Sequence, residues 1–326
     1  MGSPLRVFGT TRAGAAVHAI TLTRDGLGAT ILTYGAVLQN VRLDGVAHGL
    51  TLGSECLRDY EGNMGFHGSI VGPVANRLTD ATAPIAGTSH RFDSNFMNRH
   101  TLHSGSAGIH DKVWHIDECT DYSLILSHEL PDTQGGFPGN RRMTALFEIL
   151  SDQRLRLTLT TTTDAPSLVN ATNHSYWNLD GSDHMHDHSL RVDADRYLPT
   201  DRSDIPTGDI RLVAGTPYNF QRAKPIGPNA PPLDHTFCVA DGRRDLCDCM
   251  VLTGASGLSM QVATTEPGVH LYDARAAQRP GKPKFEGLAI ECQGWPDAPN
   301  KAGFPSIEIT PDAPVVQITQ WQFFRT

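Results

Sequence analysis

The chain has 326 residues, of which 39% are hydrophobic and 19% charged, a balance that suits a globular protein with a sizeable core. Its 27 basic and 35 acidic residues give a net charge of −8 without long runs of either sign, which argues against a nucleic-acid partner. The first ten residues lack the apolar centre of a secretory signal and no segment is long and apolar enough to span a membrane, so we expect a cytoplasmic protein.

The cysteines are scattered along the chain, and none shows the C-x-x-C spacing of a zinc or redox site. We therefore expect reduced thiols. Cys247 and Cys249 are two residues apart, and we interpret them as alternating residues of a strand rather than as a motif. The full set is Cys56, Cys119, Cys238, Cys247, Cys249 and Cys292.

Short segments with the alternation of β-strands follow one another along the whole chain. The first ends at the turn signal Asp25-Gly26, and the third closes with the hairpin dipeptide Asp44-Gly45. No stretch keeps a helical period over three turns. The segments are residues 17–23, 30–35, 37–43, 123–130, 143–150, 155–161, 189–192, 258–264 and 287–292.

This succession of strands predicts an all-β fold, a sandwich or barrel of mostly antiparallel sheet. The composition does not change abruptly and no internal repeat is visible, so residues 1–326 are predicted to form a single domain. Residues 225–233 are the richest loop, but nine residues between strand-like segments form a loop more readily than a domain boundary.

Residues 170–181, NATNHSYWNLDG, concentrate polar groups just after a strand-like segment. They combine the imidazole of His174 with three asparagines, hydroxyl groups and two aromatic rings. Buried polar groups need partners, and a site for sugar hydroxyls needs amides, aromatic walls and a group that titrates near neutrality. The alternative is a structural turn around a histidine with satisfied hydrogen bonds.

Three more stretches carry unusual polar side chains. Asn76-Arg77 sets an amide beside a guanidinium, whose rigid fork of donors suits vicinal hydroxyls or a carboxylate, although a surface arginine would give the same pattern. His103 supplies a second imidazole, in the stretch HTLHSG. Asp234 supplies a carboxyl group at the entry to an apolar strand.

Glu291 lies inside the otherwise apolar segment LAIEC, where a carboxylate without a partner would be costly to bury. Burial raises the pKa of a carboxyl group toward neutrality, which is the range that a general base needs at neutral pH. Glu291 is therefore a candidate base, and a structural glutamate with a buried partner is the alternative of equal weight.

Other patterns are less specific. His184, His186 and His188 would share one face of a strand and could bind a metal, but they also fit a polar loop that leads into residues 189–192. Ser175 has a histidine beside it but no G-x-S-x-G turn, which argues against a serine hydrolase. The sequence lacks glycine-rich nucleotide-binding motifs, so no nucleotide cofactor is implied.

Taken together and in this order, these stretches resemble the aldose 1-epimerase (galactose mutarotase) family. The resemblance runs from about Gly35 to Phe324; each motif alone is weak, and the ordered set is highly specific. It implies a single large antiparallel β-sandwich. The motifs are GPVANRL at 72–78, LHSG at 102–105, GFPGN at 136–140, TNHSYWNL at 172–179, PTG at 206–208, EPGV at 266–269, LAIECQGWPDAPN at 288–300 and FPS at 304–306.

The resemblance also implies an isomerase that interconverts the α and β anomers of a free aldose without cofactor or metal. Glu291 falls on the family's general base and His174 on its general acid, the pair that opens and recloses the sugar ring. The expected partner is a sugar or another small hemiacetal, bound by a monomer or homodimer. The remaining implied site residues are Asn76, Arg77, His103, Asp234 and His270.

Three positions depart from the family's pattern: Pro73 replaces a usual arginine, Ser104 a glycine, and His270 a glutamine that contacts the sugar in many members. The catalytic pair is retained, so these departures bear on the substrate rather than on ring opening. We expect modest activity on galactose and glucose. Two alternatives stay open: a relative that uses the same pair on another cyclic hemiacetal or specialised metabolite, and a non-catalytic carbohydrate-binding protein.

Overall fold

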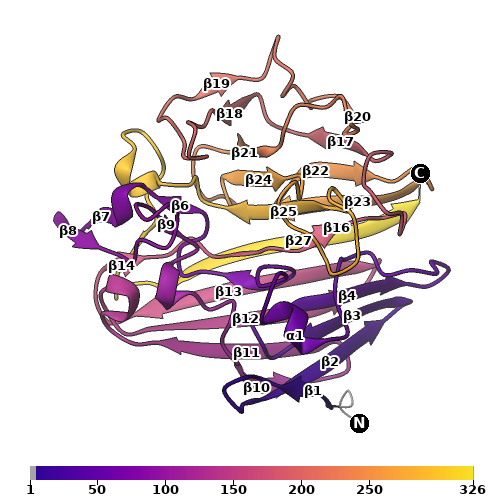
Figure 1. Ribbon diagram of the computed structural model, residues 1–326, viewed down its shortest axis with the longest axis horizontal. Helices are drawn as coiled ribbons and strands as arrows, with labels where there is room; N and C mark the ends of the chain where they lie inside the picture. Colours follow the sequence, from indigo (N-terminus) through magenta and orange to yellow (C-terminus); the bar gives the residue numbers. More distant parts are fainter. Residues whose placement is uncertain (1–4, 326) are drawn as a thin grey trace.

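The protein is built from layered antiparallel β-sheets, which confirms the predicted all-β sandwich (Figure 1). The computed structural model describes residues 5–325. No helix among these residues has the length and apolar character needed to cross a bilayer. The helical pieces are the single turn α1 (Leu57–Tyr60) and the 3-10 turns η1 (Thr79–Ala81), η2 (Gly105–Ala107), η3 (Gln134–Gly136) and η4 (Ala298–Asn300).

The largest layer is a nine-stranded antiparallel sheet that joins the middle of the chain to its C-terminal part. The long strand β27 (Val315–Arg325) lies at its centre, between β13 (Arg154–Thr163) and β23 (Leu258–Thr264). The other strands are β10 (His115–Cys119), β11 (Ser123–Leu130) and β12 (Arg141–Leu150) on one side and β22 (Cys247–Thr253), β17 (Ser189–Val192) and β20 (Lys224–Pro225) on the other.

Two further sheets complete the sandwich. In Figure 1 the N-terminal four-stranded sheet lies beside β11, β12 and β13, and the six-stranded sheet lies beside β22 and β23. The first sheet contains β1 (Arg6–Thr10), β2 (Ala16–Arg24), β3 (Leu27–Leu32) and β4 (Leu38–Leu43). The six-stranded sheet runs in the order β16 (Tyr176–Trp177), β25 (Leu288–Gln293), β24 (Gly268–Tyr272), β21 (Asp234–Cys238), β18 (Arg196–Leu198) and β19 (Arg211–Leu212).

Short two-stranded pairs connect these layers. The pairs are β5 (Ile70–Val71) with β15 (Thr172–Asn173), β6 (Arg77–Leu78) with β9 (Thr101–Leu102), β7 (Thr82–Ile85) with β8 (Thr88–Arg91), and β14 (Ser167–Leu168) with β26 (Glu308–Ile309). Three of them pair segments that are distant in sequence, and the pair of β7 with β8 is a local hairpin.

One hydrophobic core runs through all the large sheets. In β13 every second residue is buried, and Leu157 stands opposite Phe147 of β12 on the same inward face. Trp177 of β16 packs against Trp321 of β27, with ring centroids 5.6 Å apart, and so links the six-stranded sheet to the nine-stranded sheet. The same core contains Leu22 from the N-terminal sheet.

Most of the predicted segments coincide with strands: β11, β17 and β23 have the predicted bounds. Strands outside the predicted segments include β24 and the 11-residue β27, whose burial does not follow a clean alternation. The two thiols Cys247 and Cys249 do lie in one strand, β22, but a register shift between Asp248 and Met250 leaves the first exposed and the second buried. All six cysteines are free.

Candidate active site

A cavity of about 460 Å³ is lined by residues of β16, β21, β24 and β25 and of the loops beside them, and its size suits a small-molecule ligand. The residues predicted from the sequence to act on or bind a substrate come from six separate stretches of the chain. The structure brings all seven together in this cavity: Asn76, Arg77, His103, His174, Asp234, His270 and Glu291.

One wall of the cavity is the polar face of the six-stranded sheet. Side chains alternate across a strand, so Ile290 and Cys292 enter the hydrophobic core while Glu291 faces the cavity. His270 stands directly opposite Glu291 in the register of β24 and β25, and Thr236 of β21 stands opposite His270. The pairing of β21, β24 and β25 thus places Thr236, His270 and Glu291 in one row across the sheet.

The neighbouring wall carries His174, whose backbone is fastened to the segment before β5. His174 donates its backbone N–H to Ser69 O at 2.9 Å, and its carbonyl accepts the N–H of Gly68 at 3.0 Å. Asn173 donates its side-chain amide to Gly68 O at 2.8 Å and accepts the N–H of Ser175 at 3.1 Å. The asparagine therefore fixes the backbone from which the imidazole projects.

Glu291 and His174 meet where these two walls join. They are only 2% and 5% exposed, and Glu291 Oε1 lies 3.5 Å from His174 Nε2. Glu291 Oε2 and His174 Nδ1 are buried without a hydrogen-bond partner among residues 5–325. Buried polar atoms in folded proteins nearly always have partners, so these atoms indicate where a ligand supplies hydrogen bonds.

His103 is held against Asn76 by two hydrogen bonds. The backbone N–H of Asn76 donates to His103 Nδ1 at 3.1 Å, and the backbone N–H of His103 donates to Asn76 O at 2.9 Å. Burial and the nearby His174 lower the pKa of His103 well below its usual value, so the ring is neutral. Since Nδ1 accepts a hydrogen bond, the proton sits on Nε2, which is left as a donor.

Arg77 is buried rather than a surface residue, which decides between the two readings of the sequence. Its Nη2 lies 3.5 Å from Asp234 Oδ2 and 3.6 Å from Asp204 Oδ2. Its Nη1 donates to Asn76 Oδ1 at 3.3 Å, and the guanidinium carbon lies 4.8 Å from the centre of the Phe96 ring. These contacts fix the planar guanidinium at one side of the cavity.

His270 engages both of its ring nitrogens with the protein. Nε2 lies 2.9 Å from Asp234 Oδ1, and Nδ1 lies 3.0 Å from the hydroxyl of Thr236. Burial tends to raise the pKa of Asp234, but the hydrogen bond from His270 and the charges of His270 and Arg77 outweigh it and lower the pKa to about 2. A sugar hydroxyl can bind a nitrogen of His270 only in exchange for one of these contacts.

The two other departures from the family's pattern have structural roles. Ser104 adopts a left-handed conformation with φ +69°, accepts the N–H of Val74 at 2.8 Å and donates to Val74 O at 2.9 Å. It therefore ties the loop that carries His103 to the segment that carries Asn76. Pro73 is buried, accepts the N–H of Asn170 at 2.7 Å and does not line the cavity.

Several residues that line the cavity were not identified from the sequence. Asp204 and Arg275 lie in loops, where no periodic pattern marks them, and Arg275 is paired with Asp273 (Nε to Oδ1, 2.9 Å). His67 was visible as a polar residue inside GFHGS, but nothing in the sequence distinguished it from a loop residue. Phe96 and Tyr272 are two further lining residues that were not identified.

The histidine run outside the cavity forms a loop rather than a strand face, which removes the geometric reason for a metal site there. His188 is fully buried, accepts the N–H of Leu179 on Nε2 at 2.9 Å and lies 3.2 Å from Met185 O through Nδ1. His184 and His186 stack on each other at 4.5 Å. Within residues 5–325 no group of three or more His, Cys, Asp and Glu side chains is arranged to hold a metal.

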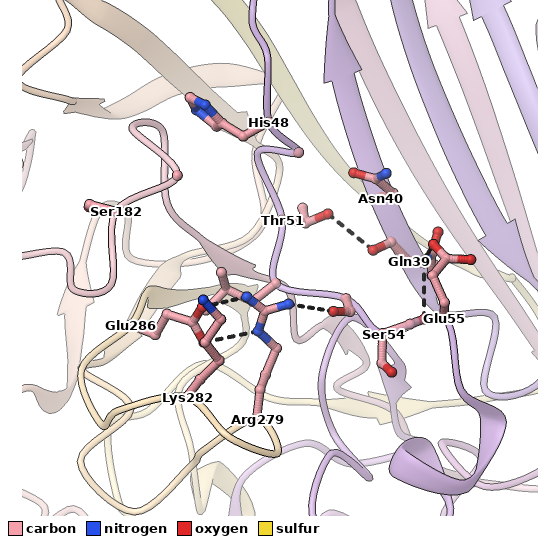
Figure 2. A pocket seen from close by; sticks show the side chains of 14 residues that line it. Gln39, Asn40, His48, Thr51, Ser54, Glu55, Ser182, Arg279, Lys282 and Glu286 are labelled. Carbon is pink, nitrogen blue, oxygen red and sulfur yellow. Dashed lines mark hydrogen bonds and ion pairs between the residues drawn. The ribbon is translucent and has the colours of Figure 1, made fainter.

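A second, smaller polar cavity of about 230 Å³ is lined by the loop between β24 and β25 and by residues 48–55 (Figure 2). Arg279 pairs there with both oxygens of Glu286 and donates to Gly53 O at 2.6 Å. Lys282 lies 3.2 Å from Asp183. Both cations are therefore paired, and their contacts hold the loop between β24 and β25 in place. The same loop carries Arg275, which lines the first cavity.

Comparison with known proteins agrees with this geometry. The family model described as aldose 1-epimerase matches residues 18–320. The chain is 31% identical to the galactose mutarotase of Rattus norvegicus, over 97% of both chains. It matches the crystal structure of the aldose epimerase homologue from C. elegans with TM-score 0.88 and 27% identity, over 95% of this chain and all of that one. It matches galactose 1-epimerase from Lactobacillus acidophilus with TM-score 0.86 and 25% identity, over 99% and 98% of the two chains. The chain therefore belongs to the aldose 1-epimerase family of isomerases.

Proposed function

We propose that the protein interconverts the α and β anomers of a free aldose, with Glu291 as general base and His174 as general acid. The observation that carries this proposal is the contact between these two buried titratable side chains, each of which keeps one polar atom without a protein partner. Membership of the family supports the reaction class, and the name of the Rattus norvegicus relative supports an aldose such as galactose as substrate.

Mutarotation moves protons at two oxygens bonded to the same carbon, the anomeric hydroxyl and the ring oxygen. Groups that serve such close oxygens must themselves be neighbours, as Glu291 and His174 are at 3.5 Å. Glu291 removes the hydroxyl proton, the bond between C1 and the ring oxygen breaks, and His174 protonates that oxygen. Rotation about C1–C2 then exposes the other face of the aldehyde, and reclosure returns both protons.

The remaining cavity residues supply donors and acceptors for the other hydroxyls of the sugar. Neutral His103 offers its Nε2–H as a donor, and the ionised carboxylate of Asp234 offers acceptors. Asn76 and Arg77, which are joined by a hydrogen bond, contribute amide and guanidinium donors. A hydroxyl both donates and accepts, so this mixture suits an unmodified sugar ring.

The charge of the cavity favours a neutral sugar over a sugar acid or sugar phosphate. Its lining residues include three carboxylates (Asp204, Asp234 and Glu291) and two guanidiniums (Arg77 and Arg275), a balance of −1 that becomes zero when His174 carries the proton it donates. Both guanidiniums are already paired with carboxylates. An anionic group on the substrate would have to displace one of these partners.

Polarimetry on freshly dissolved α-glucose, α-galactose and the corresponding uronic acids tests the proposal. We expect faster approach to the anomeric equilibrium for the neutral sugars, without added metal or cofactor, because the two side chains supply both proton transfers. A protein that binds these sugars without accelerating mutarotation would be a carbohydrate-binding module instead.

A second candidate is the same chemistry on a different cyclic hemiacetal. The observation that favours it is His270, whose nitrogens are held by Asp234 and Thr236 at a position where many relatives present an amide to the sugar. Acceleration of another lactol with little effect on galactose and glucose would support this candidate.

A further inference from the structure

His67 lines the catalytic cavity but has no role in the mechanism proposed above. It lies in the turn that precedes β5, where its backbone N–H donates to Met64 O at 2.9 Å. The residue is only 4% exposed, so its imidazole is removed from bulk water. A buried imidazole at the edge of a reaction site needs a physical reason to be there.

The position of His67 is closely tied to that of His174. The two imidazoles flank the same ring: His67 stacks on Tyr176 with centroids 4.3 Å apart, and His174 lies 5.1 Å from Tyr176. The next residue, Gly68, donates its N–H to His174 O at 3.0 Å and so joins the two backbones. Both imidazoles line the same cavity, and both lie against Tyr176.

Neither ring nitrogen of His67 has a hydrogen-bond partner in the described part of the chain, whereas His188 and His270 use both ring nitrogens on the protein and His103 uses Nδ1. The pKa of His67 is lowered to about 3, first by burial and then by the nearby His174 and Arg279, the latter of which is labelled in Figure 2. The ring is therefore neutral and offers one donor and one acceptor, the same pair as a hydroxyl group.

Packing alone does not account for an imidazole here. A phenyl ring would stack on Tyr176 as well, and it would not leave two polar ring nitrogens without a hydrogen-bond partner on the protein. The unmet hydrogen-bonding capacity instead faces a cavity whose proposed ligand is rich in hydroxyl groups.

We propose that His67 is a further substrate-binding residue, which exchanges hydrogen bonds with an aldose hydroxyl close to the anomeric centre. The inference rests on the proposed function. Because His67 lines the same cavity as the group that serves the ring oxygen, the contact falls on a hydroxyl close to C1 or to the ring oxygen. In an aldohexopyranose these are the C2 hydroxyl, on the carbon next to C1, and the C6 hydroxyl of the hydroxymethyl group bonded to C5.

The test compares His67→Phe with the parent on glucose, 2-deoxyglucose and 6-deoxyglucose, by polarimetric kinetics and by calorimetric titration. The phenyl ring keeps the stacking and removes both nitrogens. We expect KM and Kd for glucose to rise about two- to tenfold, the effect of one neutral hydrogen bond, with kcat changed less than about twofold. The rise should vanish for the deoxysugar that lacks the contacted hydroxyl.

His110→Phe is the matched control. His110 is also a largely buried imidazole, its ring lies 4.7 Å from that of Phe66, and its Nδ1 is buried without a partner, but it does not line the cavity. We expect unchanged KM and kcat for all three sugars in this variant.

Equal penalties on all three sugars, or no penalty on any, would overturn the assignment of His67. If His67→Phe does not fold, ¹⁵N-histidine NMR of the parent decides: glucose should shift the ring nitrogens of His67, and unmoved signals would overturn the inference. A parent that binds glucose through His67 but does not accelerate mutarotation would contradict the proposed function and leave the contact standing.

Discussion

Replacement of Glu291 by glutamine tests the base directly. The amide has nearly the shape of the carboxylate but cannot take a proton, and the side chain is 2% exposed in a fixed strand. Its close polar neighbour is His174 at 3.5 Å, and its second oxygen has no partner within residues 5–325, so the amide fits without displacing another group. The change therefore removes proton transfer and little else.

The expected loss of kcat follows from the role of Glu291 as the general base. A positioned general base contributes about 10²–10⁴ in rate, which corresponds to about 3–5 kcal/mol of transition-state stabilisation. We expect kcat of Glu291→Gln to fall by that factor. Sugar affinity should change less than about threefold, because Asn76, Arg77, His103 and Asp234 retain their donors and acceptors.

Polarimetry gives kcat after subtraction of the spontaneous rate, and calorimetric titration gives Kd for the same sugar. Glu266→Gln is the matched control, because Glu266 is a fully buried carboxylate paired with Arg243 (Nε to Oε1, 3.1 Å) and does not line the cavity. This control should lose thermal stability and keep its kcat. A fall of less than tenfold in kcat for Glu291→Gln, with sugar still bound, would refute the assignment of the base.

Four further outcomes are expected. His174→Asn should lower kcat more than His103→Asn, because only the first removes the proton donor; the reverse order in kinetics at several pH values would exchange the two assignments. Activity should survive dialysis against a chelator, and recovery that requires one divalent ion would contradict metal-free proton transfer. His270→Gln should raise kcat/KM on galactose, because glutamine offers an amide to the sugar where both nitrogens of His270 are held by Asp234 and Thr236; a parent that is already efficient on galactose and is made worse by the change would contradict a specialised substrate. The pKa of Asp234 is about 2 in the folded chain, below its ordinary 3.8, so Asp234 stabilises the fold by about 2 kcal/mol above pH 4 and less as the pH falls toward 2. In urea unfolding, the stability difference between the parent and Asp234→Asn should therefore shrink from pH 7 to pH 3, and a constant difference would contradict the lowered pKa.

The fold class could be predicted because alternation is a local property of the chain. In β13 each inward leucine is separated from the next by one outward residue, and that period is visible without any tertiary information. The same local reading failed for β24, where residues on both faces are buried, and for β27, where buried and partly exposed residues do not alternate regularly. That residues 1–326 form one domain remains a prediction.

The sequence by itself was enough to name seven residues of the cavity, because the ordered motifs that contain residues such as Glu291 and His174 are continuous in the chain. Only the tertiary structure decided what each residue contacts. The register of β24 against β25 puts His270 opposite Glu291, and the pairing of distant segments leaves His67 unpartnered beside His174 while both nitrogens of His270 are engaged. Hydrogen bonds of this kind depend on distances of a few tenths of an ångström between strands far apart in sequence, and no local pattern of residues specifies such distances.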